Sequence, residues 1–178
     1  MGLRVAVITV SDRSARGDRP DASGPAIIEL IKAQGWELVR SGILPDDMKI
    51  LRESIKSWAD RGDVEIILTT GGTGFAPRDV TPEATRAVID REAPGLTEAM
   101  RAASAAKTPH AMLSRAVAGI RGNVLIINLP GNPAAAIENL QVILPVLEHA
   151  VKLLQEDPMA DAGHQIFYSK KSKSNGNI

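Results

Sequence analysis

Short apolar runs alternate along the chain with longer segments in which apolar residues recur every three or four positions. The short runs are rich in β-branched residues and predict buried strands. We place these strands at 3–10, 36–44, 64–70, 117–120 and 124–129. The longer segments predict helices, because their apolar positions fall on one helical face. These helices are placed at 25–34, 46–59, 81–91, 96–106, 134–140 and from 145 to about 155.

Proline and small polar residues predict where several of these helices begin and end. Thr81 is expected to be the N-cap of a helix with Pro82 in its first turn, and Pro94–Gly95 is expected to end that helix. Asn132 is expected to cap the helix that follows it. Pro145 is expected to interrupt this helix or restart it, because proline lacks a backbone N–H.

Strands that alternate with helices indicate an α/β fold with a mostly parallel sheet and helices on both faces. The Arg-Gly-Asn segment at 121–123 separates the last two strands and predicts an antiparallel hairpin. We therefore expect a three-layer αβα sandwich whose mostly parallel sheet contains one antiparallel strand. Residues 1–156 contain no linker and predict one domain, whereas the polar segment 157–178 is expected to be a flexible C-terminal tail.

Composition narrows the class of protein. The 178 residues are 44% apolar and 24% charged, which fits one globular domain and excludes a disordered chain. Lys and Arg (21) balance Asp and Glu (21), so bulk charge favours neither a nucleic-acid nor a membrane partner. The absence of cysteine excludes disulfides, zinc–thiolate sites and thiol nucleophiles. The apolar run Val5–Val10 is far shorter than the ~20 residues of a membrane span, so we expect a cytoplasmic protein.

Polar or glycine-rich residues follow four of the predicted strands. In an open parallel sheet the carboxyl ends of the strands form the ligand-binding edge. We therefore expect the loops after these strands to meet at one site. They begin at Ser11-Asp12, Pro45-Asp46-Asp47, Gly71–Gly74 and Pro130-Gly131-Asn132.

The Gly-Gly-Thr-Gly segment at 71–74 is the strongest single feature. Glycines let backbone N–H groups approach an oxyanion, Thr73 adds a hydroxyl, and a helix N-terminus follows. The alternative is a plain glycine-rich turn, and the segment alone does not decide between them. It is neither a P-loop nor a GxGxxG motif, which disfavours ordinary GTPases, ATPases and dehydrogenases.

Each charged residue in the loops after the predicted strands has a functional and a structural interpretation. Arg78 could bind a phosphate and Asp79 could hold Mg²⁺, although spacing alone favours a turn closed by Asp79. Of Asp46 and Asp47, one is expected to cap a helix, so at most one faces the site. Asp12 could equally belong to a turn. The three histidines show no metal-binding spacing and are given no catalytic role.

Several segments resemble one known family. TTGGTG (69–74) followed by PRDVTPEA (77–84) resembles the signature of the MogA/MoaB-type molybdenum cofactor biosynthesis family. The resemblance extends over about 3–155 and includes the G domain of gephyrin and of plant molybdenum-insertion proteins. The other matching segments, in the expected order, are VAVITVSDR (5–13), ILPDD (43–47), PGLTEAMR (94–101), AMLSRAVAGIRG (111–122) and INLPGNP (127–133).

The resemblance implies a molybdopterin adenylyltransferase, which transfers AMP from Mg·ATP to the molybdopterin phosphate and releases pyrophosphate. The two essential aspartates of the family fall on Asp46 and Asp79, which the resemblance also implies as ligands of Mg²⁺. The family is typically a homotrimer, sometimes a hexamer, and passes its product to a downstream molybdenum-insertion enzyme. The expected substrate-binding residues are Ser11, Asp12, Thr70, Gly71, Gly72, Thr73, Gly74, Arg78, Ser114, Pro130, Gly131 and Asn132.

Two departures from the family pattern concern one loop. Asn132 stands where the family often has Ser or Gln, and Ala134 stands where it often has Lys. Two other functions fit the same resemblance: a non-catalytic molybdopterin-binding or carrier protein, and a scaffold whose oligomer face is the function. Because both aspartates are retained, the catalytic interpretation is favoured.

Overall fold

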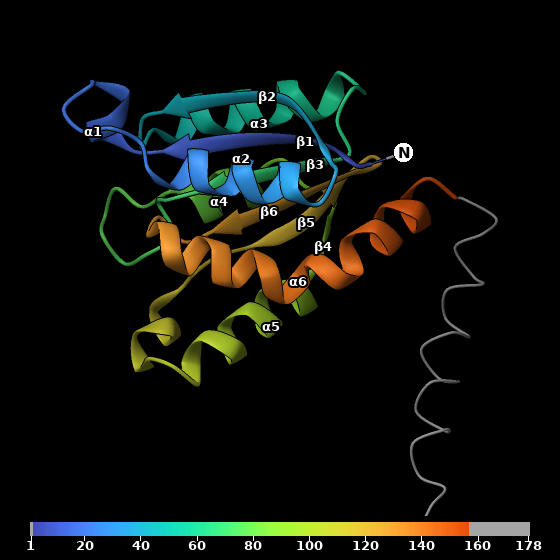
Figure 1. Ribbon diagram of the computed structural model, residues 1–178. Helices are drawn as coiled ribbons and strands as arrows, with labels where there is room; N and C mark the ends of the chain where they lie inside the picture. The colour runs from blue at the N-terminus through green and yellow to red at the C-terminus, as the bar shows by residue number, and fades with distance from the viewer. Residues whose placement is uncertain (1, 157–178) are drawn as a thin grey trace, which may run out of the picture.

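A six-stranded sheet forms the middle layer of the fold (Figure 1). In this computed structural model, which describes residues 2–156, the strand order is β2-β1-β3-β6-β5-β4. The strands β1, β2, β3 and β6 are mutually parallel, β5 is antiparallel to β6, and β4 is antiparallel to β5. The strands are β1 (Arg4–Val10), β2 (Glu37–Leu44), β3 (Ile66–Thr70), β4 (Arg91–Glu92), β5 (Ala118–Arg121) and β6 (Val124–Leu129).

Helices cover both faces of this sheet. On one face α2, α5 and α6 pack over β1, β3 and β6, and on the other face lie α3 and α4 (Figure 1). The short helix α1 follows β1 directly. The helices are α1 (Asp12–Ala15), α2 (Ser23–Ala33), α3 (Met48–Asp60), α4 (Thr81–Arg86), α5 (Pro94–Ala105), the 3-10 helix η1 (Pro109–Leu113) and α6 (Pro133–Leu154).

The central strands are apolar because both of their faces are buried. Along β1, Val5 and Val7 pack in the cluster beneath α2 and α6, whereas Ala6 and Ile8 pack in the cluster beneath α3. This alternation is the two-residue period of a strand. The predicted three-layer sandwich is therefore confirmed. Because β4 is antiparallel to β5, β5 alone runs against the other strands of the described sheet.

The edge strand β4 was not predicted, because residues 81–91 were assigned to one helix. That helix ends at Arg86. The N–H of Asp90 then donates to the carbonyl of Ile120 at 2.7 Å, and the N–H of Ala93 donates to the carbonyl of Ala118 at 2.8 Å. This segment is therefore a strand because it pairs with β5, some thirty residues further along the chain. Local helix and strand propensities do not contain that information.

The predictions made from Thr81, Pro94 and Pro145 about where helices begin or end are wrong. Thr81 lies inside α4, and its hydroxyl donates to the carbonyl of Gly71 at 2.9 Å instead of capping the helix. Pro94 begins α5, since the first position of a helix needs no N–H donor. Pro145 lies within a continuous α6, where Ile143 and Leu147 on either side are buried in the core. Packing of both halves on the sheet therefore outweighs the hydrogen bond that Pro145 cannot make.

Two further expectations concern the C-terminal part of the chain. Asn132 caps α6 as predicted, because its side chain accepts from the N–H of Ala135 at 3.1 Å. The segment 157–178, predicted to be a tail, lies outside the described residues. None of the helices within 2–156 is long and apolar enough to cross a bilayer.

An ion pair holds the hairpin to the helices at the amino end of the parallel strands. Arg121 donates from Nε to Asp60 at 2.7 Å, and its Nη1 donates to the carbonyl of Val88 at 2.8 Å. The hydrogen bond from Arg121, and to a smaller extent that from Lys56, lowers the pKa of the Asp60 carboxyl from 3.8 to about 2. The charged form of Asp60 is therefore favoured in the folded protein.

Because this pKa is lowered on folding, the stabilisation by Asp60 is present above pH 3.8 and is lost as the pH falls toward about 2. We predict that Asp60→Asn lowers the free energy of unfolding at pH 7 and that the difference from the unsubstituted protein shrinks at pH 2.5. Urea unfolding at the two pH values measures this. Asp18→Asn, which loses only an exposed contact with Arg16, is the control. Equal destabilisation by Asp60→Asn at both pH values would contradict the prediction.

Candidate active site

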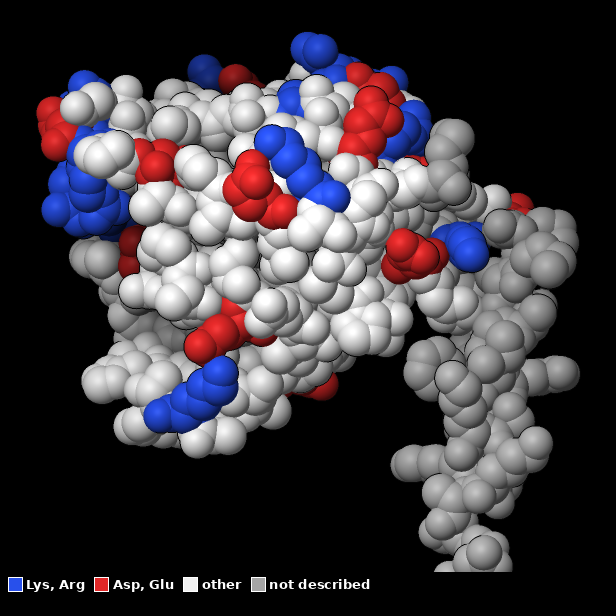
Figure 2. All heavy atoms as spheres, viewed as in Figure 1, with Lys and Arg blue, Asp and Glu red and all other residues white. Residues whose placement is uncertain are grey.

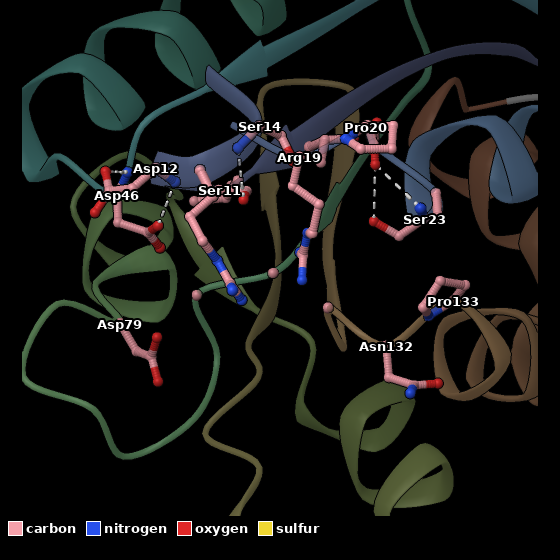
Figure 3. Close-up of a pocket in the computed structure, with 18 of the residues that line it drawn as sticks. Ser11, Asp12, Ser14, Arg19, Pro20, Ser23, Asp46, Asp79, Asn132 and Pro133 are labelled. Atoms are coloured by element: carbon pink, nitrogen blue, oxygen red, sulfur yellow. Dashed lines mark hydrogen bonds between the residues drawn. The ribbon is translucent and has the colours of Figure 1, made fainter. Parts of the chain in front are cut away.

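A cavity of about 600 Å³ lies at the carboxyl ends of the parallel strands (Figure 3). The loops after β1, β2, β3 and β6 all contribute to it, as the topology predicted. Nine of the predicted site residues line this cavity. They are Ser11, Asp12, Asp46, Gly71, Gly72, Arg78, Asp79, Gly131 and Asn132.

The other predicted residues lie elsewhere. A second cavity of about 310 Å³ is lined by Thr73, Gly74, Ser114 and Pro130, together with residues of α5, η1 and α6. Thr70 lines neither cavity: it is fully buried, and its hydroxyl donates to the carbonyl of Pro130 at 2.6 Å. In this position Thr70 ties the end of β3 to the loop after β6.

A pair of reciprocal hydrogen bonds joins the loops after β1 and β2. The N–H of Asp12 donates to Oδ2 of Asp46 at 2.9 Å, and the N–H of Asp46 donates to Oδ1 of Asp12 at 3.1 Å. Asp47 turns away and caps α3, since its Oδ1 accepts from the N–H of Ile50 at 2.9 Å. Of the two adjacent aspartates, Asp46 is thus the one that faces the cavity.

Negative charge is concentrated around Asp46. Its pKa is raised, first because the carboxyl is partly buried and then because the charges of Asp12 and Asp79 lie nearby. The hydrogen bond from the Asp12 N–H and the charge of Arg78 act in the opposite direction. A cation placed here would relieve the repulsion among the three carboxylates.

Glycines of the 71–74 loop make room for the two predicted catalytic carboxylates. Gly72 has φ +61°, and a Cβ on it would lie 2.4 Å from Oγ1 of Thr81 and 3.0 Å from Oδ1 of Asp46. A Cβ on Gly74 would lie 2.8 Å from Oδ2 of Asp79. The two carboxylates are therefore packed directly against the backbone of this loop.

The backbone donors of the loop are used unequally. The N–H of Gly71 donates to the carbonyl of Leu129 at 3.1 Å and extends the β3–β6 pairing. By contrast, the N–H groups of Gly72 and Gly74 make no hydrogen bond with any described residue. These two glycine amides, on either side of Thr73, are therefore free to bind an anion.

Sequence reasoning missed two arginines that line the first cavity, Arg13 of α1 and Arg19 of the segment that follows it. Figure 3 shows the Arg19 side chain pointing into the cavity. Neither of them, nor Arg78, forms an ion pair with another described residue. Basic side chains also gather at the α1 end of the molecule in Figure 2, whereas charges of both signs are scattered over the α2 and α6 face. The three arginines within 13–19 were the available signal.

Asp21 also lines the cavity, but it serves the scaffold. Its Oδ2 accepts from Oγ1 of Thr9 at 2.7 Å, and its Oδ1 accepts from the N–H groups of Ser23 at 3.0 Å and Gly24 at 3.1 Å. These bonds start α2 two residues earlier than Pro25, where the sequence predicted it. Asp21 therefore fixes the wall of the cavity rather than offering a free carboxylate.

The two cavities share one wall. Gly71 and Gly72 face the first cavity, and Thr73 and Gly74 face the second. The loop after β6 divides in the same way, with Gly131 and Asn132 on one side and Pro130 on the other. Two ligands bound in these cavities would therefore meet at the glycine loop.

Within 2–156, no group of three or more His, Cys, Asp or Glu side chains could hold a metal ion unaided. Asp46 and Asp79 instead offer two carboxylates beside a cavity, which suits Mg²⁺ because Mg²⁺ takes most of its oxygens from water and phosphates. The residues present therefore fit a magnesium ion that arrives with a phosphate ligand.

Several known proteins are similar to this chain in sequence. The molybdenum cofactor synthesis protein cinnamon of Drosophila melanogaster is 44% identical over 152 residues, which are 85% of this chain and 25% of that protein. The chain thus spans about a quarter of the length of cinnamon, and likewise of the gephyrin of Dictyostelium discoideum. The molybdopterin adenylyltransferase of Escherichia coli K12 is 42% identical over 142 residues, which are 78% of this chain and 72% of that enzyme.

Solved structures agree with the fold. The molybdopterin biosynthesis enzyme MoaB of Thermus thermophilus superposes with a TM-score of 0.82 and 49% identity, and the match covers 88% of this chain and 98% of that one. The family described as "Probable molybdopterin binding domain" matches residues 6–149, which include all the residues that line the first cavity. By this match, the chain belongs to the family of molybdopterin-binding domains.

Proposed function

We propose that this chain is a molybdopterin adenylyltransferase that transfers AMP from ATP to the terminal phosphate of molybdopterin. The observation that carries the proposal is the packing of the Asp46 and Asp79 carboxylates against one glycine loop, which lies at the boundary of two cavities. A reaction that joins two phosphorylated substrates needs two neighbouring sites and a means of neutralising charge between them. The relatives named as molybdopterin adenylyltransferases support the same activity.

The proposed reaction forms one P–O bond and breaks another. An oxygen of the molybdopterin phosphate attacks the α-phosphorus of ATP, the bond between this phosphorus and the bridging α–β oxygen breaks, and pyrophosphate leaves. The attacking phosphate is already ionised at neutral pH, so no strong base is required. The protein's task is to hold two anions in line and to offset their repulsion.

We assign ATP to the first cavity and the pterin to the second. The first cavity contains Arg13, Arg19 and Arg78, whose guanidinium groups can each donate paired hydrogen bonds to phosphate oxygens. The second cavity is lined by Met100, Leu113 and other apolar side chains, with Ser114 and Asn139 among the polar ones. Such a lining suits a flat heteroaromatic ring that carries a few donors and acceptors.

Asp46 and Asp79 would hold Mg²⁺ at the ATP phosphates. When bound, the ion would offset the charge of the nucleotide phosphates and of the leaving pyrophosphate. Asp12 keeps Asp46 in place through the reciprocal hydrogen bonds, and the free N–H groups of Gly72 and Gly74 would donate to phosphate oxygens at the wall.

The proposal extends to the assembly and its setting. We propose a cytoplasmic homotrimer that hands its adenylylated product to a downstream molybdenum-insertion enzyme, as the family resemblance implies. A trimeric mass by light scattering would support this assembly, and a monomeric mass would contradict it.

The direct test of the activity is pyrophosphate release from Mg·ATP and molybdopterin. Release that requires both substrates supports the adenylyltransferase. Binding of molybdopterin without release would instead favour a carrier protein with the same fold. Omission of the pterin is the control for ordinary ATP hydrolysis.

We predict that Asp46→Asn and Asp79→Asn each lower kcat by about 100-fold or more, because each loses a charge that offsets the phosphates. Asparagine keeps an oxygen that accepts the Asp12 or Ala76 N–H, so the midpoint of thermal unfolding should stay within a few degrees. Asp47→Asn is the matched control, because asparagine is an equally good helix cap. Full activity in both site variants would overturn the assignment of the two aspartates.

We predict that Gly72→Ala abolishes measurable turnover and destabilises the protein by about 1–2 kcal/mol, the cost of a left-handed residue with a side chain. The new Cβ would displace the Thr81 hydroxyl and push against the Asp46 carboxylate. Gly95→Ala is the control, since nothing lies within 4 Å of a Cβ at that position. Pyrophosphate release and urea unfolding are measured on both variants, and an active Gly72→Ala would show that the Asp46 contact is dispensable.

Arg19→Ala is predicted to raise the KM for ATP about tenfold through loss of one charge-assisted hydrogen bond, with the KM for molybdopterin unchanged. Arg16→Ala is the matched control, because Arg16 lies on the same exposed segment but does not line the cavity and pairs with Asp18. A change in the molybdopterin KM alone would reverse the assignment of the two cavities.

A further inference from the structure

The guanidinium group of Arg115 lies inside the loop that carries Asp79. Its Nε donates to the carbonyl of Gly74 at 2.7 Å, and its Nη2 donates to the carbonyl of Asp79. The backbone N–H of the same residue donates to the carbonyl of Thr73 at 2.9 Å. One arginine therefore contacts both the beginning and the end of the loop.

Among residues 2–156, Arg115 is the sole source of hydrogen bonds to segment 73–79 from outside that segment. The remaining bonds are internal: the N–H of Asp79 donates to the carbonyl of Ala76 at 2.8 Å, and the N–H of Ala76 donates to Oδ2 of Asp79 at 3.0 Å. The loop is thus a small self-bonded unit whose place is set by Arg115.

Arg115 is in turn fixed to the scaffold. Its Nη1 donates to Oε1 of Glu83 on α4, in an ion pair whose side chains are 32% and 42% exposed. The other carboxylate oxygen of Glu83 is buried and has no hydrogen-bond partner among the described residues. The arrangement runs from α4 through Glu83 and Arg115 to the backbone of Asp79.

We propose that Arg115 is a positioning residue that sets the place of the Asp79 carboxylate relative to Asp46. This inference rests on the proposed function. Arg115 does not line the first cavity, so it acts through the loop rather than by touching ATP. The role requires arginine, because a planar guanidinium can direct donors to Gly74, Asp79 and Glu83 at once, whereas a lysine ammonium cannot match that geometry.

The neighbouring residue gives this position a second consequence. Ser114, which precedes Arg115 directly, lines the second cavity. One dipeptide therefore contacts the proposed pterin site on one side and holds the magnesium-binding loop on the other. Displacement of Arg115 should still affect the metal and the chemical step more than pterin binding, because the guanidinium bonds all go to the loop and to α4.

The test compares Arg115→Lys with Arg121→Lys. Arg121 is a matched control because it too donates to a carboxylate and to a backbone carbonyl, but at the opposite end of the sheet. We expect Arg115→Lys to lower kcat about 100-fold and to raise the Mg²⁺ concentration for half-maximal activity about tenfold, with the molybdopterin KM within about threefold. Arg121→Lys should change thermal stability while leaving kcat and the Mg²⁺ requirement unaltered.

A second readout does not depend on turnover. The affinity for Mn²⁺ in the presence of a non-hydrolysable ATP analogue, followed by electron paramagnetic resonance, should fall about tenfold in Arg115→Lys and stay constant in Arg121→Lys. If the unsubstituted protein releases no pyrophosphate, the proposed function fails, but the Mn²⁺ comparison still decides the role of Arg115. Equal Mn²⁺ affinities in the two variants would overturn the inference.

Glu83→Gln is the second variant, in case Arg115→Lys does not fold. It removes the charge that anchors Arg115 but keeps the shape of the side chain and an oxygen acceptor. We expect a smaller effect in the same direction: kcat lower by about fivefold to tenfold, with the molybdopterin KM unchanged. An unchanged kcat and Mn²⁺ affinity in Glu83→Gln would remove the proposed link between α4 and Asp79.

Discussion

Both faces of β1, β3 and β6 are covered by helices, so these strands can present polar groups to a ligand only where they end. This constraint brings four loops to one edge of the sheet and forces them close together. The reciprocal bonds of Asp12 and Asp46 and the packing of Gly72 against Asp46 are results of that crowding. The wall of the site at the glycine loop is therefore made of backbone and short side chains.

The first cavity holds unpaired charges of both signs, although the net charge of the protein is zero. Nine ion pairs are formed among the described residues, yet Arg13, Arg19 and Arg78 take part in none of them. The carboxylates of Asp46 and Asp79 face the same space. Charges of both signs therefore line the cavity without forming ion pairs with one another, which suits a ligand that combines a metal cation with a polyanion.

Local pattern was sufficient for the features that depend on neighbours in sequence. It predicted the three-layer fold, the loops at the strand ends and the Asn132 cap. It also predicted that at most one of Asp46 and Asp47 faces the site. It could not predict β4, because two residues pair with a strand far along the chain. The continuity of α6 through Pro145 depends on core packing. Likewise, the division of residues 71–74 between two cavities depends on which way each backbone unit faces, and Arg19 reaches the site only because α1 turns the chain back.

The wall shared by the two cavities has a consequence for inhibition. Because the wall is formed by glycines and the short Thr73, compounds bound on either side would be separated by little more than one thickness of backbone. A single molecule with one group for each cavity would need only a short linker over the loop. Such a molecule would benefit from a high effective concentration at the second site, so that two weak fragments could combine into one tight ligand.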